Sequence, residues 1–237
     1  MSRRRRNRRK DARRQQQGRT LITHINPRSP ISEQYRTVRT NIEFSSIDQP
    51  IQSIVVTSAG PSEGKSMSAA NLAVVYAQQE KKVLLIDGDL RKPTVHYTFK
   101  LDNISGLSNY LVQGVGLEEI TRSSDINNLS VISSGPIPPN PSELLGSNRM
   151  KQFMKEAKEA YDIVIVDSPP VTVVTDAQVL SNLVDGTVLV VRSKQTEIEL
   201  AIRAKEALES VNARILGTIL NDLDKSASSN YYYYYGT

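Results

Sequence analysis

The sequence has no cysteine and only two histidines, His24 and His96, among its 237 residues. Without cysteine the chain forms no disulfide bond and offers no thiolate ligand, which excludes zinc–thiolate and iron–sulfur sites held by this chain. Two histidines are too few for a histidine-based metal site. No apolar run reaches about 18 residues, so we expect no transmembrane helix. The N-terminus has no apolar segment of the kind found in secretory signals, so we expect none.

Charge is unevenly spread along the chain. The net charge is +5, yet residues 1–19 (MSRRRRNRRKDARRQQQGR) hold ten basic residues and one acid, which leaves the rest net negative. This segment has almost nothing apolar to bury, so we expect a disordered basic tail. Contact with an anionic membrane or another acidic partner is favoured. The alternatives are a tail that only aids solubility and one that binds nucleic acid, the latter disfavoured because no aromatic residue lies among the arginines.

Short runs rich in Val and Ile alternate with helical patterns in the rest of the chain. Continuous apolar runs suit strands that are covered on both faces. The expected strands are Ser53–Thr57, Val83–Ile86, Leu129–Ile132, Ile163–Val166, Thr187–Val191 and Ile215–Leu220. The expected helices are Ile31–Phe44, Ser66–Gln79, Met150–Ala160 and Glu197–Ser210. This alternation predicts a doubly wound α/β domain with a mainly parallel sheet flanked by helices.

Two helix starts have capping signals. Ser32 is a candidate N-cap for the first helix, with prolines shortly before it. Asn140 is a candidate N-cap for a further helix, with Pro141 at the first helical position and Glu143 three residues after the cap.

The loop after the first strand has the pattern of a phosphate-binding loop. Residues 60–66 read GPSEGKS, and the strict pattern G-x-x-x-x-G-K-[ST] would want glycine at Ala59. Gly64 allows close backbone approach, Lys65 can reach the β- and γ-phosphates, and Ser66 can join the Mg²⁺ shell. The preceding strand and following Ala-rich helix favour this interpretation over an accidental match. The residues expected to contact the nucleotide are Gly60, Pro61, Ser62, Glu63, Gly64, Lys65, Ser66 and Met67.

Three aspartates follow two of the other expected strands. VLLIDGDL places Asp87 and Asp89 just past one strand, and IVIVDSPP places Asp167 past another. Open α/β sheets bind ligands at the carboxyl ends of their strands. Asp167 can hold Mg²⁺ directly or through water, Asp89 can bind the metal, and Asp87 can orient or deprotonate a hydroxyl. A lone aspartate there is usually a turn residue, but three beside a phosphate loop favour a site.

Taken together, these segments resemble the bacterial tyrosine kinases, a family of P-loop kinases. GPSEGKS, LLIDGDLRKP and VIVDSPP are similar to its Walker A, Walker A′ and Walker B motifs. SEQYRTVRTN has its E-x-x-R-x-x-R pattern, SGPIPPNPSELL is also typical, and YYYYYGT resembles its autophosphorylation cluster. The resemblance runs from about Ser32 to Thr237. It implies the P-loop NTPase fold of the MinD/ParA-like superfamily.

The resemblance implies an ATP-dependent protein-tyrosine kinase with ATP and Mg²⁺ as cofactors. Asp87 would activate the acceptor hydroxyl, with Lys65 and Asp89 as the other catalytic residues. The metal would be held or positioned by Ser66, Asp89 and Asp167. The acceptors would be tyrosines of other proteins and the cluster of a neighbouring subunit, which consists of Tyr231, Tyr232, Tyr233, Tyr234 and Tyr235.

The tyrosine cluster has an alternative interpretation as a sticky low-complexity end. The flexible segment Asp224–Asn230 before it favours an accessible substrate tail. Tethering within an oligomer would raise its effective concentration towards the millimolar range. Each phosphate adds roughly −1.5 to −2 charges, so several would repel one another and loosen the assembly.

A stripe on the first helix is the candidate oligomerisation surface. Glu33, Arg36 and Arg39 fall on one face of the helix over residues 31–44, because residues three apart lie about one turn apart. The resemblance implies that this face pairs with a neighbour in a ring-shaped homo-oligomer. From the residues alone, an intrahelical Glu–Arg pair on a solvated face is the favoured alternative.

The resemblance also implies partners and a location. We expect a basic tail (1–19), a kinase domain (20–223) and a tyrosine-rich tail (224–237). The partners would be a membrane-bound activator that acts through its cytoplasmic tail, and a cognate tyrosine phosphatase. The protein would be cytoplasmic and peripheral at the inner face of the cell membrane. It would regulate capsular or extracellular polysaccharide synthesis and export.

Two departures from the family pattern keep other functions open. Met67 stands where a Ser or Thr is usual, so a hydroxyl contact to phosphate is lost, and Ser62 stands where glycine is common. One alternative is a MinD/ParA-like switch ATPase, against which Gly60 counts because that class usually has a signature lysine there. The other is a nucleotide-binding adaptor or pseudokinase, for which Met67 is the best support.

Overall fold

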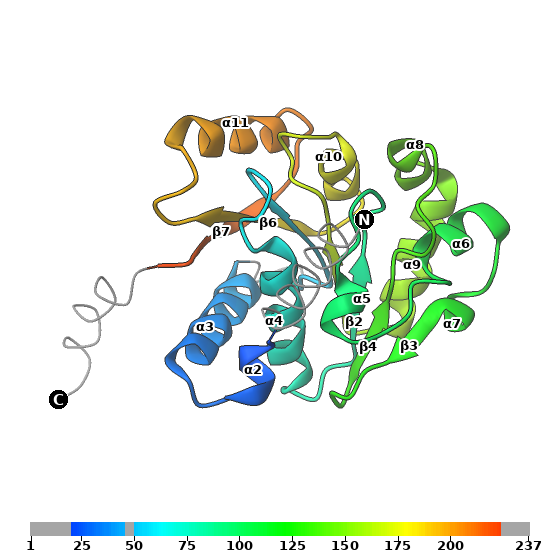
Figure 1. Ribbon diagram of the computed structural model, residues 1–237, viewed down its shortest axis with the longest axis horizontal. Coiled ribbons are helices and arrows are strands. Elements are labelled where there is room, and N and C mark those ends of the chain that lie inside the picture. Colours follow the sequence, from blue (N-terminus) through cyan, green and yellow to red (C-terminus); the bar gives the residue numbers. More distant parts are fainter. Residues whose placement is uncertain (1–19, 46–49, 224–237) are drawn as a thin grey trace, which may run out of the picture.

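A seven-stranded sheet organises the computed structural model, which describes residues 20–45 and 50–223 (Figure 1). The strands are β1 (Ser53–Ser58), β2 (Val83–Asp87), β3 (Thr121–Ser123), β4 (Leu129–Ile132), β5 (Ile163–Asp167), β6 (Gly186–Arg192) and β7 (Ile215–Asn221). Their order is β3-β4-β2-β5-β1-β6-β7, and all neighbours are parallel except β3 with β4. The predicted fold class is confirmed. The short antiparallel edge strand β3 is not among the expected strands.

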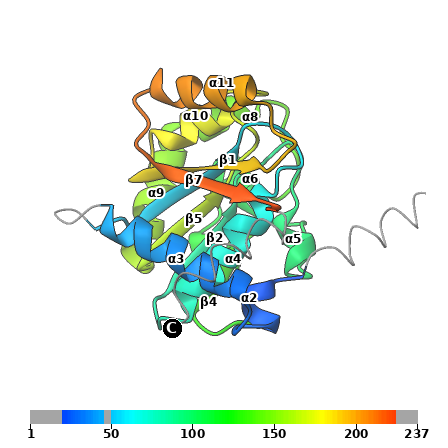
Figure 2. The ribbon, with the colours of Figure 1, turned by 90° about the vertical axis from the view of Figure 1, so that its left-hand side faces the viewer.

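Helices cover both faces of this sheet (Figure 2). They are α2 (Ile22–Ile25), α3 (Pro30–Phe44), α4 (Lys65–Ala77), α5 (Val95–Thr98), α6 (Leu107–Gln113), α7 (Leu117–Ile120), α8 (Pro141–Leu145), α9 (Asn148–Ala160), α10 (Asp176–Ser181) and α11 (Ile198–Glu209). Alternate residues of a strand face opposite sides. Val83 and Leu85 therefore pack with α4, whereas Leu84 and Ile86 pack with α6 and α9. None of the helices in the described ranges is long and apolar enough to cross a bilayer.

One of the two capping predictions is wrong, and the other is confirmed in its position. The prediction of Ser32 as N-cap is wrong, because α3 begins at Pro30 and the N-cap is Ser29, whose hydroxyl accepts a hydrogen bond from the Ser32 amide at 3.1 Å. Proline suits the first helical position, which moves the helix start upstream. Asn140 does occupy the N-cap position of α8, but its side chain caps no backbone N–H. Its Nδ2 donates instead to Glu143 Oε2 at 2.8 Å.

The sheet brings the three motif strands side by side. β5 lies between β2 and β1, and all three run parallel, so their carboxyl ends meet at one edge. Asp87 and Asp167 are the last residues of β2 and β5 and are direct register partners. The prediction from the sequence placed both aspartates just beyond their strands. In the structure β2 and β5 include them, because the two aspartates are still register partners in the parallel sheet. The predicted basic and tyrosine-rich tails, 1–19 and 224–237, lie outside the described residues.

Candidate active site

The phosphate loop joins β1 to α4 through a strained turn. Gly64 occupies the N-cap position of α4 with φ of 95°, a left-handed conformation that favours glycine. A Cβ at this position would lie 2.1 Å from Nδ2 of Asn221, so space as well as backbone conformation excludes larger residues. Ser62 also has positive φ, 64°. The residue that departs from the family's common glycine therefore holds a conformation that glycine adopts more easily.

Lys65 lies at the centre of the predicted site. It is the first residue of α4, and its Nζ lies 3.2 Å from Asp89 Oδ2, 3.3 Å from Asp167 Oδ1 and 3.3 Å from Ser66 Oγ. Burial opposes the charge on this ammonium, but the carboxylates of Asp167, Asp89 and Asp87 outweigh burial and raise its pKa. The lysine therefore stays charged, as required for contact with phosphate.

Asp87 is the most enclosed acid of the site. Its side chain is fully buried, and Oδ2 accepts hydrogen bonds from the amides of Thr94 and Val95, each at 2.9 Å. Oδ1 accepts only a longer bond, 3.3 Å, from the Asp89 amide. Burial, and then the negative charge of Asp167, raise the pKa of Asp87 to about 7. A carboxylate with this pKa is suited to accept a proton near neutral pH.

Asp167 has the features of a cation ligand. It is fully buried, and its Oδ2 has no hydrogen-bond partner within the described residues. Burial raises the pKa of Asp167, while Lys65 and the Ser66 hydroxyl favour its ionised form. An unpartnered buried carboxylate oxygen is costly unless a cation or its water faces it. A hard oxygen ligand beside a serine hydroxyl fits Mg²⁺.

No group of three or more His, Cys, Asp or Glu side chains in the described ranges has the arrangement of a complete metal site.

The loop after β2 is connected to α10 and α8 by hydrogen bonds. Asp89 Oδ1 accepts hydrogen bonds from the amides of Arg91 and Lys92, which folds residues 88–95 around the two aspartates. Arg91 forms a bidentate pair with Asp176 of α10, and its Nη2 also donates to Ser142 Oγ of α8 at 2.9 Å. This contact is not among the predictions made from the sequence, although LRKP directly after Asp89 was an available signal.

A second missed contact supports the phosphate loop from β7. Glu63 is buried, and its Oε2 accepts a hydrogen bond from the Gly60 amide at 2.8 Å. Thr196 donates to Glu63 Oε1, and Asn221 Nδ2 donates to the Glu63 carbonyl at 2.9 Å. The available signal was a polar residue, Asn221, at the carboxyl end of an apolar strand, the same signal that identified the aspartates.

Three further residues predicted to contact the nucleotide differ in their exposure to solvent. Pro61 and Ser62 are exposed at the tip of the phosphate loop. Met67 is half-buried and packs against the core between the sheet and α4.

The α3 stripe is apart from the phosphate site. Glu33 and Arg36 form an ion pair within the helix, and Arg36 Nη2 donates to the Pro27 carbonyl at 2.6 Å. Arg39 Nη1 donates to the Val75 carbonyl of α4 at 2.8 Å. Within one copy of the chain, the arginines thus stabilise α3 and join it to α4. The oligomerisation role stays a prediction.

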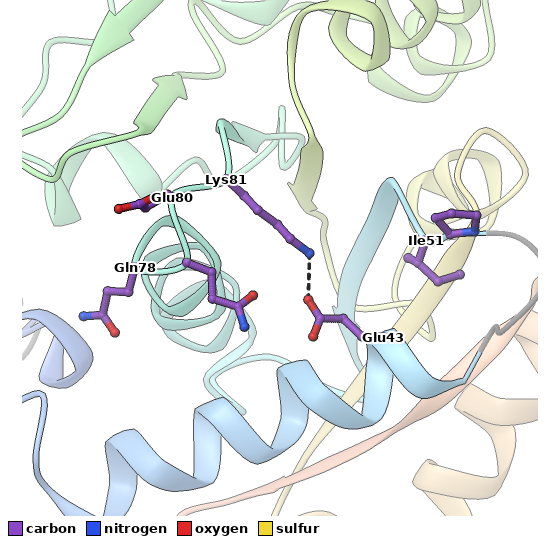
Figure 3. Close-up of a pocket in the computed structure, with 7 residues that line it drawn as sticks. Glu43, Ile51, Gln78, Glu80 and Lys81 are labelled. Atoms are coloured by element: carbon purple, nitrogen blue, oxygen red, sulfur yellow. Dashed lines mark hydrogen bonds and ion pairs between the residues drawn. The ribbon is translucent and has the colours of Figure 1, made fainter.

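A separate pocket of about 840 Å³ lies near the amino ends of β1 and β2, at the opposite end of these strands from the candidate site (Figure 3). It is lined by residues that precede β1 and β2 and by the end of α3, among them Glu43, Ile51 and Lys81. Lys81 Nζ and Glu43 Oε1 form an ion pair of 2.7 Å across it. None of the predicted site residues lines this pocket, so it is separate from the phosphate site.

Comparison with known proteins identifies the family. A family model described as an AAA domain matches residues 51–215. The chain is 54% identical over 216 residues to the tyrosine-protein kinase YwqD of Bacillus subtilis, covering 91% of each chain. The chain belongs to the bacterial tyrosine kinase family. A further relative of this family, the tyrosine-protein kinase CapB of Staphylococcus aureus, is 42% identical over 91% of the chain and 95% of its own length.

Solved structures agree with this assignment. The crystal structure of the chimerical protein CapA2B2 has a TM-score of 0.84 and 46% identity, covering 86% of the chain and 90% of that protein. The septum site-determining protein MinD of Pyrococcus horikoshii, solved with Mg-ADP, has a TM-score of 0.62 and 21% identity over 76% of each chain. The second likeness shows the shared fold alone.

Proposed function

We propose that this chain uses ATP–Mg²⁺ to phosphorylate tyrosines of its own C-terminal cluster, Tyr231–Tyr235, on a neighbouring copy, and tyrosines of other proteins. The observation that carries the proposal is the convergence of Lys65 with Asp87, Asp89 and Asp167 at the carboxyl edge of β1, β2 and β5. Membership of the bacterial tyrosine kinase family supports it.

The residues divide into two roles around the phosphates. The Lys65 ammonium and the N-terminus of α4 would bind the β- and γ-phosphate oxygens. Ser66 Oγ and Asp167 Oδ2 would hold Mg²⁺, which when bound neutralises charge that develops on the transferred phosphoryl group. Asp89 keeps Lys65 in place and closes the loop over residues 88–95 through its second oxygen.

Asp87 would accept the proton of the tyrosine hydroxyl. Its Oδ1 is the available atom, because Oδ2 already accepts two backbone hydrogen bonds. The side chain is fully buried in this conformation. The hydroxyl therefore reaches Oδ1 only when the loop over residues 88–95 shifts, and we propose that this shift accompanies binding of the acceptor.

The wider role proposed here rests on family membership. The chain would assemble as a ring-shaped homo-oligomer through Glu33, Arg36 and Arg39. A membrane protein would activate it through a cytoplasmic tail and hold it at the inner face of the membrane. A cognate phosphatase would reverse the reaction, and the cycle would regulate polysaccharide synthesis and export. The basic segment 1–19 would add contact with anionic lipid.

A phosphotyrosine assay tests the proposal. The full chain is incubated with ATP–Mg²⁺, with and without a candidate activator tail, beside Lys65→Met and a chain that ends before Tyr231. Phosphotyrosine in the parent that is absent from both variants is the expected result. ATP hydrolysis without phosphotyrosine would instead indicate a switch ATPase, and ATP binding without either activity would indicate an adaptor.

A further inference from the structure

The last residue of the sheet contacts the phosphate loop. Asn221 ends β7, the edge strand, and its Nδ2 donates to the Glu63 carbonyl at 2.9 Å. The Asn221 carbonyl accepts a hydrogen bond from the Ser193 amide at 2.8 Å, which fixes the strand end against the chain that leaves β6. The backbone of Asn221 is thus held by the segment after β6, and its side-chain amide is held by the phosphate loop.

A second contact fixes the same turn from the segment after β6. Thr196 Oγ1 donates to Glu63 Oε1 and accepts a hydrogen bond from the Arg192 amide at 2.7 Å. Glu63 Oε2 accepts from the Gly60 amide, so both carboxylate oxygens of this buried side chain are used within the site. Glu63 therefore stabilises the loop from within through Gly60. It is itself held by Thr196, which follows β6, and by Asn221 of β7.

The geometry of the peptide bond makes the Asn221 contact directional. In a planar trans peptide the C=O and N–H groups point in opposite directions. Because the Glu63 carbonyl points at Asn221, the Gly64 N–H points away from Asn221. Loops of this type bind phosphate through such backbone N–H groups. Gly64 is packed so closely against the Asn221 amide that no Cβ fits between them.

We propose that Asn221 is a positioning residue for nucleotide binding, which holds the Glu63–Gly64 peptide so that the Gly64 N–H faces the phosphates. Thr196 assists by fixing the Glu63 side chain. This inference rests on the proposed function in so far as the ligand is ATP. It assigns to the end of β7 a role in the affinity of a site that lies between β1 and α4.

Nucleotide titration of the full chain tests this role. The probe is the fluorescent analogue mant-ADP with Mg²⁺, and the variants are Asn221→Asp, Asn221→Ala and Thr196→Val. Asn221→Asp keeps the shape but replaces the donor with an anion near the phosphates. We expect it to weaken binding by about tenfold or more, which corresponds to about 1.4 kcal/mol. We expect smaller losses for the other two variants. Asn212→Asp, the same change at an exposed turn, is the matched control and should bind as the parent does.

The thermal unfolding midpoint without nucleotide separates positioning from general stability. We expect the Asn221 variants to remain folded at the assay temperature while their affinity falls. Affinities within twofold of the Asn212→Asp control would overturn the inference, as would losses that only follow the unfolded fraction. If Asn221→Asp does not fold, Asn221→Ala and Thr196→Val decide by the same criterion. A parent that does not bind mant-ADP–Mg²⁺ would contradict the proposed function instead.

Discussion

Arg91 and Asp176 form a bidentate ion pair that links the loop after β2 to α10, with Nε to Oδ2 at 2.9 Å and Nη2 to Oδ1 at 3.0 Å. The Asp176 side chain is fully buried, whereas that of Arg91 is 38% exposed. Arg91 belongs to the same loop as Asp87 and Asp89, and Asp176 begins α10. The pair therefore connects the loop that follows Asp87 and contains Asp89 to α10.

Removal of this pair should destabilise the fold and impair catalysis. Arg91→Ala leaves a buried carboxylate with only the Ser142 hydroxyl as a donor among the side chains described. We expect a loss of about 1–3 kcal/mol in the free energy of unfolding, at the low end of buried pairs because Arg91 is partly exposed. Urea denaturation measures it. Lys155→Ala, which breaks an exposed 4.0 Å pair with Glu159, is the control and should change stability by less than about 0.5 kcal/mol.

The buried acid Asp87 should make stability depend on pH in a defined direction. Its pKa is about 7 in the folded protein and about 4 when unfolded, so folding favours the protonated form. Its contribution to stability is full below about pH 4, falls as pH rises to 7 and stays low above that. Asp87→Asn keeps an acceptor for the Thr94 and Val95 amides and does not ionise. We therefore expect the free energy of unfolding of the variant, minus that of the parent, to be larger at pH 8 than at pH 5.

Urea denaturation at both pH values, without nucleotide, checks this prediction. The difference between variant and parent cancels the titration of groups that do not interact with Asp87. An equal difference at pH 5 and pH 8 would contradict the raised pKa. The same variant should lose phosphotyrosine formation by about 10²-fold or more, because it removes the proposed proton acceptor.

Substitution of Gly64 should disrupt the phosphate loop. Gly64→Ala combines a left-handed backbone with a Cβ only 2.1 Å from Asn221 Nδ2. We expect about 1–3 kcal/mol of destabilisation and loss of nucleotide binding. Gly116→Ala is the matched control, because φ is −71° there and the nearest atom would be Glu119 Oε1 at 3.4 Å. Thermal unfolding and nucleotide titration of both variants should separate them; similar behaviour would argue against the strain at Gly64.

Met67→Thr should increase turnover at some cost in stability. The change adds a hydroxyl directly after Ser66, the serine proposed to bind Mg²⁺, so we expect a higher rate of phosphotyrosine formation. It also removes packing against the core beside α4, at a cost of about 1 kcal/mol. Initial rates and urea denaturation measure the two effects. An unchanged or lower rate in a folded variant would show that Met67 does not limit the reaction.

A chain that ends at Leu223 should separate nucleotide binding from the acceptor tail. It keeps Asn221 and all residues of the phosphate loop but lacks the tyrosine cluster. We expect unchanged affinity for mant-ADP–Mg²⁺ and no phosphotyrosine on the truncated chain itself. A full chain with Lys65→Met, added as acceptor, should become phosphorylated by the truncated chain if transfer occurs between copies. No signal on that acceptor would contradict transfer in trans.

The sequence by itself determined the features that depend on local patterns. Apolar runs identified six of the strands, the GKS loop indicated a phosphate site, and acids after apolar runs indicated Asp87, Asp89 and Asp167 as candidate site residues. Such signals are readable because strand propensity and loop conformation depend mostly on neighbouring residues. The convergence of the aspartates followed from one further rule, that parallel strands end at the same edge.

Only the tertiary structure decided which distant residues support those motifs. Arg91 contacts Asp176 across 85 residues, and Asn221 contacts Glu63 across 158 residues. These pairs depend on strand order and register, which place β7 two strands from β1 and α10 beside the loop after β2. A single sequence does not encode such order in any local pattern, because strand order arises from the joint packing of the whole sheet.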